Sequence, residues 1–231
     1  MLFFDPLYFI IVSPALILAV FAQVWVKKAY SKYSRVATAF GYSGAQAAAE
    51  ILRRNGVMDV DVEVAQGFLS DHYDPGKKVL RLSPDVYSGR TMASVGIAAH
   101  EAGHALQHAD GYAPLKLRTA LVPMTMLGSN LAFPLLFIGF LMQSASLVNF
   151  GIIFFGTVVL FQVVTLPVEF NASRRALAML RSTGVVSTDE LSGARSVLTA
   201  AAMTYVAAAL SAILQLVYFL LRAGLLGGRD D

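Results

Sequence analysis

Four long apolar runs constrain the fold of this chain more than any other feature of its sequence. The runs cover residues 7–26, 121–142, 147–168 and about 204–221, and none contains a charged residue. Each is close to the roughly 20 residues that a helix needs to cross the hydrocarbon core of a bilayer. All are apolar on every side, whereas a helix at the surface of a soluble domain keeps a polar face. We therefore expect a mostly α-helical membrane protein with four transmembrane helices.

The composition agrees with a membrane protein and narrows the chemistry open to the chain. Of its 231 residues, 56% are hydrophobic and 14% are charged, so we expect the lipid bilayer to be a partner. The sequence has no cysteine, which excludes disulfides, thiolate zinc ligands and cysteine nucleophiles. The formal net charge of +3 is carried by scattered basic residues, and we expect no nucleic-acid partner.

Lys and Arg residues between the apolar runs predict the orientation, since loops that stay in the cytoplasm are enriched in positive charge. They follow the first run, precede the second and follow the third, at Lys27, Lys28, Lys32, Arg35, Lys116, Arg118, Arg174, Arg175 and Arg181. The turn at residues 143–146 carries no charge. We therefore expect residues 27–120 and 169–203 to face the cytoplasm, although Arg222 and Arg229 count against this orientation.

Local patterns predict the structure of the first cytoplasmic segment. Residues 43–54 have helical periodicity and end at Asn55-Gly56, as a helix with a C-cap does. Residues 60–64 and 78–82 alternate between apolar and other side chains, and the polar residues 70–76 separate them. We expect either a small β-hairpin with its tip at residues 70–76 or two short paired strands. We also expect a free strand edge at residues 78–82, on which a peptide could dock.

Two further helices are expected. An alanine-rich apolar stretch predicts a helix over residues 89–109, which Gly111 and Pro114 would end. Residues 187–190 read Ser-Thr-Asp-Glu, which is the pattern of a capping box, so a helix should begin there and continue into the fourth apolar run.

Residues 100–104 of the predicted helix match the pattern H-E-x-x-H. Residues four apart lie on one helix face, so the imidazoles of His100 and His104 can reach a single Zn²⁺. Glu101 points in a neighbouring direction, where its carboxylate can act as general base on a metal-activated water. Two His and one Glu in an apolar segment would be costly to bury without a partner such as a metal. The pattern predicts a zinc-dependent peptidase.

A catalytic zinc takes three protein ligands, so a third ligand must lie elsewhere. His108 is two helical turns from His100, about 12 Å along the axis, which is too far for one ion to bridge. Glu169 follows the third apolar run directly, and a carboxylate at that depth needs a reason. We expect Glu169 to complete a gluzincin-like site and His108 to support it or to end the helix.

Four segments together resemble the YugP-type bacterial membrane zinc metallopeptidases. They are residues 71–75 (DHYDP), 80–84 (LRLSP), 98–108 (AAHEAGHALQH) and 166–175 (LPVEFNASRR). The likeness covers almost the whole chain. It implies a neutral zinc peptidase of the prokaryotic inner membrane. Together with the four spans, we expect a zincin-like cytoplasmic domain.

A more distant likeness joins the chain to the HtpX-type and CAAX prenyl endopeptidases. In that group a Glu in an E-F/Y-x-A-D stretch after a span completes the zinc site. Here residues 169–173 keep the Glu and the Ala but have Ser173 in place of the Asp. The likeness therefore supports Glu169 as a ligand and leaves the role of the Asp without a counterpart.

The expected organisation has five segments. They are a first span (1–26), a cytoplasmic zincin-like region (27–120), a transmembrane hairpin (121–168), cytoplasmic helices with the third ligand (169–203), and a fourth span with its tail (204–231). The expected substrate is a peptide or protein of unknown identity. Oxyanion stabilisation is open among His72, Asn171, Arg174 and Tyr205, and a homo-oligomer or a membrane protein partner is left open.

Other functions fit parts of the sequence. A site-2-type intramembrane protease would carry H-E-x-x-H inside a span, but Arg90 and residues 108–110 bound a shorter helix here, and no Leu-Asp-Gly motif appears. A non-catalytic zinc-containing membrane scaffold or chaperone is a second alternative. A transporter or channel is disfavoured, because the spans lack charged residues.

Overall fold

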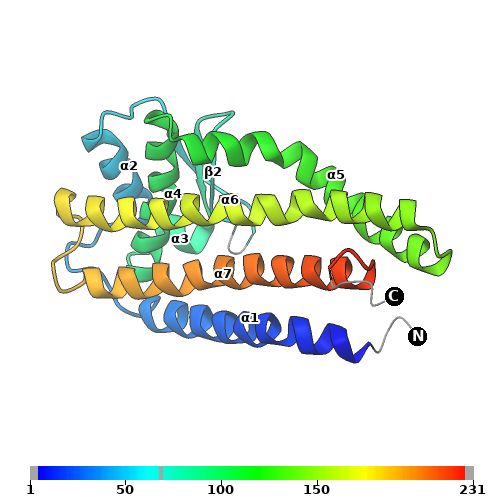
Figure 1. Ribbon diagram of the computed structural model, residues 1–231. Helices are drawn as coiled ribbons and strands as arrows, with labels where there is room; N and C mark the ends of the chain where they lie inside the picture. The colour runs from blue at the N-terminus through cyan, green and yellow to red at the C-terminus, as the bar shows by residue number, and fades with distance from the viewer. Residues whose placement is uncertain (1–4, 68–69, 227–231) are drawn as a thin grey trace. The chain divides into compact units, whose positions relative to one another are not determined.

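The computed structural model (Figure 1) describes residues 5–67 and 70–226, so Arg229 lies outside the described residues. The chain is mostly helical, as predicted. In order, the elements are α1 (Pro6–Tyr33), α2 (Gly44–Arg54), β1 (Asp61–Val64), β2 (His72–Asp74), β3 (Val79–Leu82), α3 (Pro84–Ser88), α4 (Met92–Ala109), α5 (Ala113–Leu141), α6 (Ala145–Thr183) and α7 (Leu191–Arg222).

Four helices, α1, α5, α6 and α7, are long and apolar enough to cross a membrane. Each covers one of the predicted apolar runs, with the single exception of Met142, which follows the end of α5, and this confirms the expectation of four candidate spans. The helices extend beyond the runs. In particular, α6 has 39 residues and continues without a break past Pro167 and Glu169 to Thr183. The predicted third ligand is therefore part of the same helix as the third run.

The described residues form two compact units. The first comprises the described parts of Met1–Phe21, Lys116–Pro167 and Thr204–Asp231, and the second comprises Ala22–Leu115 and Val168–Met203. The core of the first unit is aromatic: the rings of Phe155 and Phe219 meet edge to face at 5.3 Å. The second unit contains α2, α3, α4 and the sheet.

Helix α2 forms for the reasons that its sequence suggests. The hydroxyl of Ser43 accepts the Gln46 N–H at 3.2 Å, and the Gln46 side chain accepts the Ser43 N–H at 3.0 Å, which makes a capping box. At the other end, Gly56 has a φ of 72°, a left-handed conformation that glycine adopts without strain. The helix buries Ile51 and Leu52 against the core of the second unit, which confirms the prediction for residues 43–54.

The two predicted strands pair with each other, but the sheet differs from the prediction in their direction and in a third strand. Its order is β1-β3-β2, with β1 parallel and β2 antiparallel to β3. The hairpin therefore consists of β2 and β3, and β2 lies in the segment predicted as the polar tip. Because β3 has a neighbour on each side, the expectation of a free edge at residues 78–82 was wrong. The tight turn between β2 and β3 forms because the Asp74 carboxylate accepts the backbone N–H groups of Gly76 and Lys77.

Helix α4 begins at Met92, three residues later than predicted, because the backbone is extended at Gly89 and Thr91. Residues 84–88 form the separate short helix α3. Thr91 caps α4 by accepting the Ser94 N–H at 3.2 Å, and Gly111, with a φ of 64°, follows its end. Helix α7 begins at Leu191, just after Glu190 accepts the Ser187 N–H at 2.8 Å, and runs unbroken to Arg222, as expected.

Candidate metal centre

The candidate site lies where α4 and α6 meet inside the second unit. Helix α4 carries His100, Glu101 and His104, and α6 carries Glu169. The backbones of the two helices touch at Gly103: a Cβ atom there would lie 2.6 Å from the carbonyl oxygen of Ala172. The absence of a side chain at Gly103 therefore lets the two helices approach closely.

The structure brings the three predicted ligands together. Each of His100, His104 and Glu169 offers one ligand atom, and these atoms lie within 4.8 Å of one another. The Glu169 carboxylate oxygen Oε2 is 3.1 Å from His100 Nε2 and 3.6 Å from His104 Nε2. Among the residues described, this is the group of His, Asp and Glu that could hold a metal ion.

Burial and charge at this cluster favour a cation. Glu169 is only 2% exposed and His104 8% exposed. Burial lowers the pKa of His104, but its hydrogen bond with Glu169 and the charges of Glu101 and Glu169 outweigh that effect, so the pKa of His104 is raised. The pocket thus stabilises positive charge at the place where a metal would bring it.

Each imidazole of the cluster has a second partner that fixes its orientation. Nδ1 of His104 lies 3.0 Å from Oε1 of Gln107, and Nδ1 of His100 lies 3.1 Å from the hydroxyl of Ser173. An amide oxygen can only accept, so His104 Nδ1 donates to Gln107, which leaves Nε2 as the nitrogen that faces Glu169 and that would bind a metal. Partners of this kind orient metal-binding histidines.

Gln107 is completely buried, and it also joins the two helices. Its NH₂ group donates to the carbonyl oxygen of Val168 and to Oδ1 of Asn171, both at 2.9 Å. Asn171 accepts a second hydrogen bond from Arg175 at 2.8 Å, and Arg175 pairs with Asp110 at the end of α4. Hydrogen bonds through Gln107 therefore connect His104 to the turn of α6 that carries Glu169.

Glu101 is 9% exposed and follows His100 directly on α4. Within the described part of the chain, no hydrogen bond or ion pair engages its carboxylate, and its charge acts on His104. A nearly buried carboxylate without a protein partner is costly to maintain. The group is therefore available to a ligand in the site.

His108 lies outside the cluster. Its Nδ1 is 2.8 Å from the hydroxyl of Tyr73 on β2, so the side chain joins the end of α4 to the sheet. Burial, with the charges of Asp59 and Asp74, raises the pKa of Tyr73 to about 12, so the phenol keeps its proton at neutral pH.

The four residues considered for oxyanion stabilisation are placed differently. Oδ1 of Asn171 is occupied by Gln107 and Arg175. His72 is exposed and has Nδ1 2.8 Å from the carbonyl oxygen of Ser70. Arg174 is exposed on α6, and Tyr205 belongs to the first unit. Asn171 is linked to His104 through Gln107.

Sequence reasoning missed Gln107 and Ser173. A usable signal existed, because Gln107 is three residues after His104 and Ser173 is four residues after Glu169, positions that share a helix face. Ser173 stands where the wider group has Asp, a position whose role is not predicted by the sequence alone. Its hydroxyl in fact contacts His100.

Two comparisons with known proteins agree with the geometry. The family model described as "Putative neutral zinc metallopeptidase" matches residues 8–224. A curated relative, "Putative membrane protease YugP" of Bacillus subtilis (strain 168), is 46% identical over 226 residues, which cover 97% of this chain and 99% of that protein. No solved structure matches. Two imidazoles and a carboxylate are a donor set that catalytic zinc accepts. The chain belongs to the neutral zinc metallopeptidase family.

Proposed function

We propose that the protein is an integral membrane zinc endopeptidase of the gluzincin-like type. In this proposal His100, His104 and Glu169 hold the metal, and Glu101 is the general base. The observation that carries the proposal is that the three ligand atoms lie within 4.8 Å of one another. They come from two helices, and His100 and Glu169, which are in contact, are 69 residues apart in the sequence.

The residues of the chain have distinct tasks in this reaction. Zinc, when bound, would polarise the scissile carbonyl and lower the pKa of the attacking water. The ligand side chains are held in place by Gln107 and Ser173, so the site needs little reorganisation before it acts. The Glu101 carboxylate takes the proton of the attacking water and delivers it to the leaving amine. The peptide bond is hydrolysed without a covalent intermediate.

The proposal places the site on the cytoplasmic side of a bacterial inner membrane. Its support is the distribution of Lys and Arg, which favours residues 27–120 and 169–203 as the cytoplasmic segments. The spans would then be the apolar runs in 1–26, 121–168 and 204–231.

Substitution of the proposed base tests the function. Glu101→Gln keeps the size of the side chain but cannot take a proton. The full-length protein is purified in detergent, its zinc content is measured, and cleavage of unfolded casein is compared between wild type and Glu101→Gln. We expect equal zinc content and a loss of cleavage of at least about 100-fold, the lower range for general-base catalysis.

The same experiment separates the proposal from its rivals. Equal cleavage by the two proteins would contradict the role of Glu101. Bound zinc without cleavage of any tested substrate by the wild type would favour the zinc-containing scaffold or chaperone. Cleavage restricted to transmembrane substrates would favour the site-2-type protease.

A further inference from the structure

The exposed side chains of α1 change in chemistry along the helix. Ile17, Val20 and Phe21 are large apolar groups that are 70%, 65% and 56% exposed. From six residues after Phe21, exposed residues are basic: Lys27, Lys28 and Lys32, followed by Arg35 just after the helix. In a membrane, a helix surface of this kind passes from the acyl-chain region to the phosphate region of the lipid.

The basic residues gather on one surface. Lys28 and Lys32 are four residues apart and lie on the same side of α1. Together with Lys27, Ser31, Arg35 and Val24 they line a shallow depression of about 620 Å³. We call this surface the basic depression. Val24, which belongs to the apolar run, is the one apolar residue that lines the basic depression. The basic depression therefore offers an apolar side and a cationic side together.

No acidic side chain balances the basic depression among the residues that the structure describes. Lys32 lies over the ring of Tyr33 at 5.0 Å. None of the four cations of the basic depression takes part in an ion pair within the described residues. A cluster of uncompensated positive charges at the end of an apolar helix attracts anions at the membrane surface.

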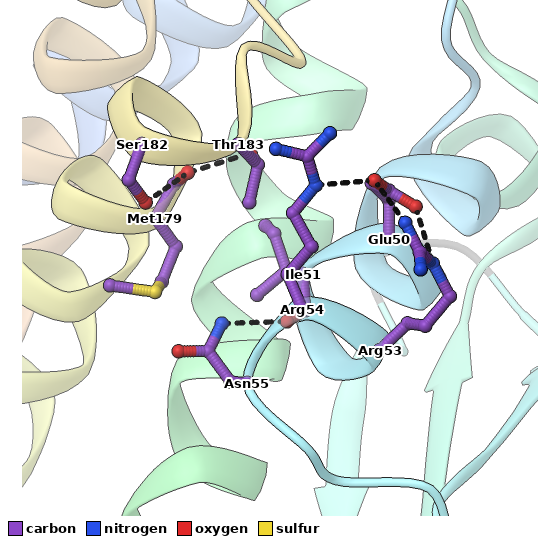
Figure 2. Close-up of polar contacts among 8 residues, drawn as sticks. All are labelled: Glu50, Ile51, Arg53, Arg54, Asn55, Met179, Ser182 and Thr183. Carbon is purple, nitrogen blue, oxygen red and sulfur yellow. Dashed lines mark hydrogen bonds and ion pairs between the residues drawn. The ribbon is translucent and has the colours of Figure 1, made fainter.

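A second exposed basic cluster in the same unit shows the contrast. Figure 2 shows Arg53 and Arg54 of α2 with the carboxylate of Glu50 between them. Arg53 donates to Glu50 at 2.9 and 3.0 Å, and Arg54 donates to it at 2.5 Å. These contacts hold the pKa of Glu50 at about 2, so the carboxylate stays ionised and neutralises part of the cluster.

We propose that the basic depression of α1 binds the headgroup of an anionic phospholipid, with the acyl chains along the apolar part of the helix. Lys28, Lys32 and Arg35 contact the phosphodiester, and Val24 contacts the start of the chains. The proposal does not depend on peptidase activity, since it uses none of the residues of the metal cluster.

Lipid binding to the purified full-length protein tests this proposal. The protein in detergent is titrated with dioleoyl phosphatidylglycerol or dioleoyl phosphatidylcholine, and bound lipid is counted by native mass spectrometry. We expect phosphatidylglycerol to bind at least about tenfold more tightly, with an affinity that falls as salt rises. Lys28→Gln/Lys32→Gln should weaken that binding about 25-fold, from about 1 kcal/mol for each cation near the surface.

A charge-matched control is available in the cluster of Figure 2. Arg53→Gln/Arg54→Gln also removes two positive charges from the same unit. It should leave phosphatidylglycerol binding within about twofold of wild type. Lys28→Arg/Lys32→Arg should restore binding, which shows that charge at these positions, and not folding, decides the result. Glu101→Gln should bind lipid as wild type does, whatever its activity.

Three results would overturn the proposal. Equal phosphatidylglycerol binding by wild type and Lys28→Gln/Lys32→Gln would mean that the lipid binds elsewhere. Equal loss in Arg53→Gln/Arg54→Gln would mean that net charge alone decides. Competition by glycerol 1-phosphate at the same concentration as the lipid would assign the depression to a soluble phosphate.

Discussion

Gly103 of α4 faces the backbone of Ala172 of α6 so closely that a Cβ atom at position 103 would lie 2.6 Å from the Ala172 carbonyl oxygen. Gly103 is one residue before His104, and Ala172 is three residues after Glu169. On α4 the contact lies between the two histidines of the metal cluster, and on α6 it lies about one turn after Glu169. Backbone packing at this point therefore sets the spacing of the candidate ligands.

Gly103→Ala should destabilise the protein and weaken zinc binding together. The carbonyl oxygen is backbone and cannot move aside cheaply, so the helices must separate, at a cost of about 1–3 kcal/mol for overpacking. Gly96→Ala on the same helix is the control, because its Cβ would meet Ala194 at an ordinary 3.6 Å. The gain in helix propensity, about 1 kcal/mol, is common to both.

Thermal unfolding in detergent and zinc titration measure the two effects. We expect Gly96→Ala to be as stable as wild type or slightly more so, with unchanged zinc affinity. A Gly103→Ala protein with wild-type stability and zinc affinity would show that the close approach of α4 and α6 does not set the site.

Gln107→Leu should lower zinc affinity about 10- to 100-fold, the effect usual for losing a residue that orients a ligand. Leucine has a similar size but offers no acceptor to His104 and no donor to Val168 or Asn171. Gln107→Glu keeps the acceptor and loses the donors, so the two variants separate the orientation of His104 from the link to α6.

Gln46→Leu is the matched control for these variants. It removes a glutamine that is also hydrogen-bonded in the second unit, but in the capping box of α2. Its stability should fall by about 1 kcal/mol while zinc affinity stays at the wild-type value. If Gln46→Leu and Gln107→Leu change zinc affinity equally, the role assigned to Gln107 is wrong.

Removal of the metal should lower thermal stability. A ligand at 100 times its dissociation constant stabilises the folded state by about 2.7 kcal/mol, which corresponds to a shift on the order of 5 °C or more for a chain of this size. Dialysis against a chelator should therefore lower the unfolding temperature, and added zinc should restore it. Glu169→Ala should unfold at the same temperature with and without the chelator.

Much of the fold follows from local sequence. Long charge-free runs predict spans because composition and length alone decide whether a helix can cross a bilayer. The ends of α2 were predictable because Ser43 and Gly56 act through contacts within a few residues. The cluster of His100, His104 and Glu169 was also anticipated, since helix periodicity aligns the first two and the position after an apolar run singles out the third.

The rest depends on contacts between segments far apart in the sequence. The parallel direction of the β1–β3 pair and the third strand β2 were missed, because alternation identifies a strand but not the direction or number of its partners. Gln107 and Ser173 were missed because their roles depend on which side chains face them across the α4–α6 contact. Gly103 could be recognised as part of the motif, but its function as a contact point needs the position of Ala172.

The number of zinc ions bound by Glu169→Ala, compared with His108→Ala, tests the central claim most directly. Both full-length variants are purified in the same detergent, and zinc per chain is measured by mass spectrometry after gel filtration. The account predicts about one zinc per chain for wild type and for His108→Ala, and almost none for Glu169→Ala. A Glu169→Ala protein that retains its zinc while His108→Ala loses it would contradict the account.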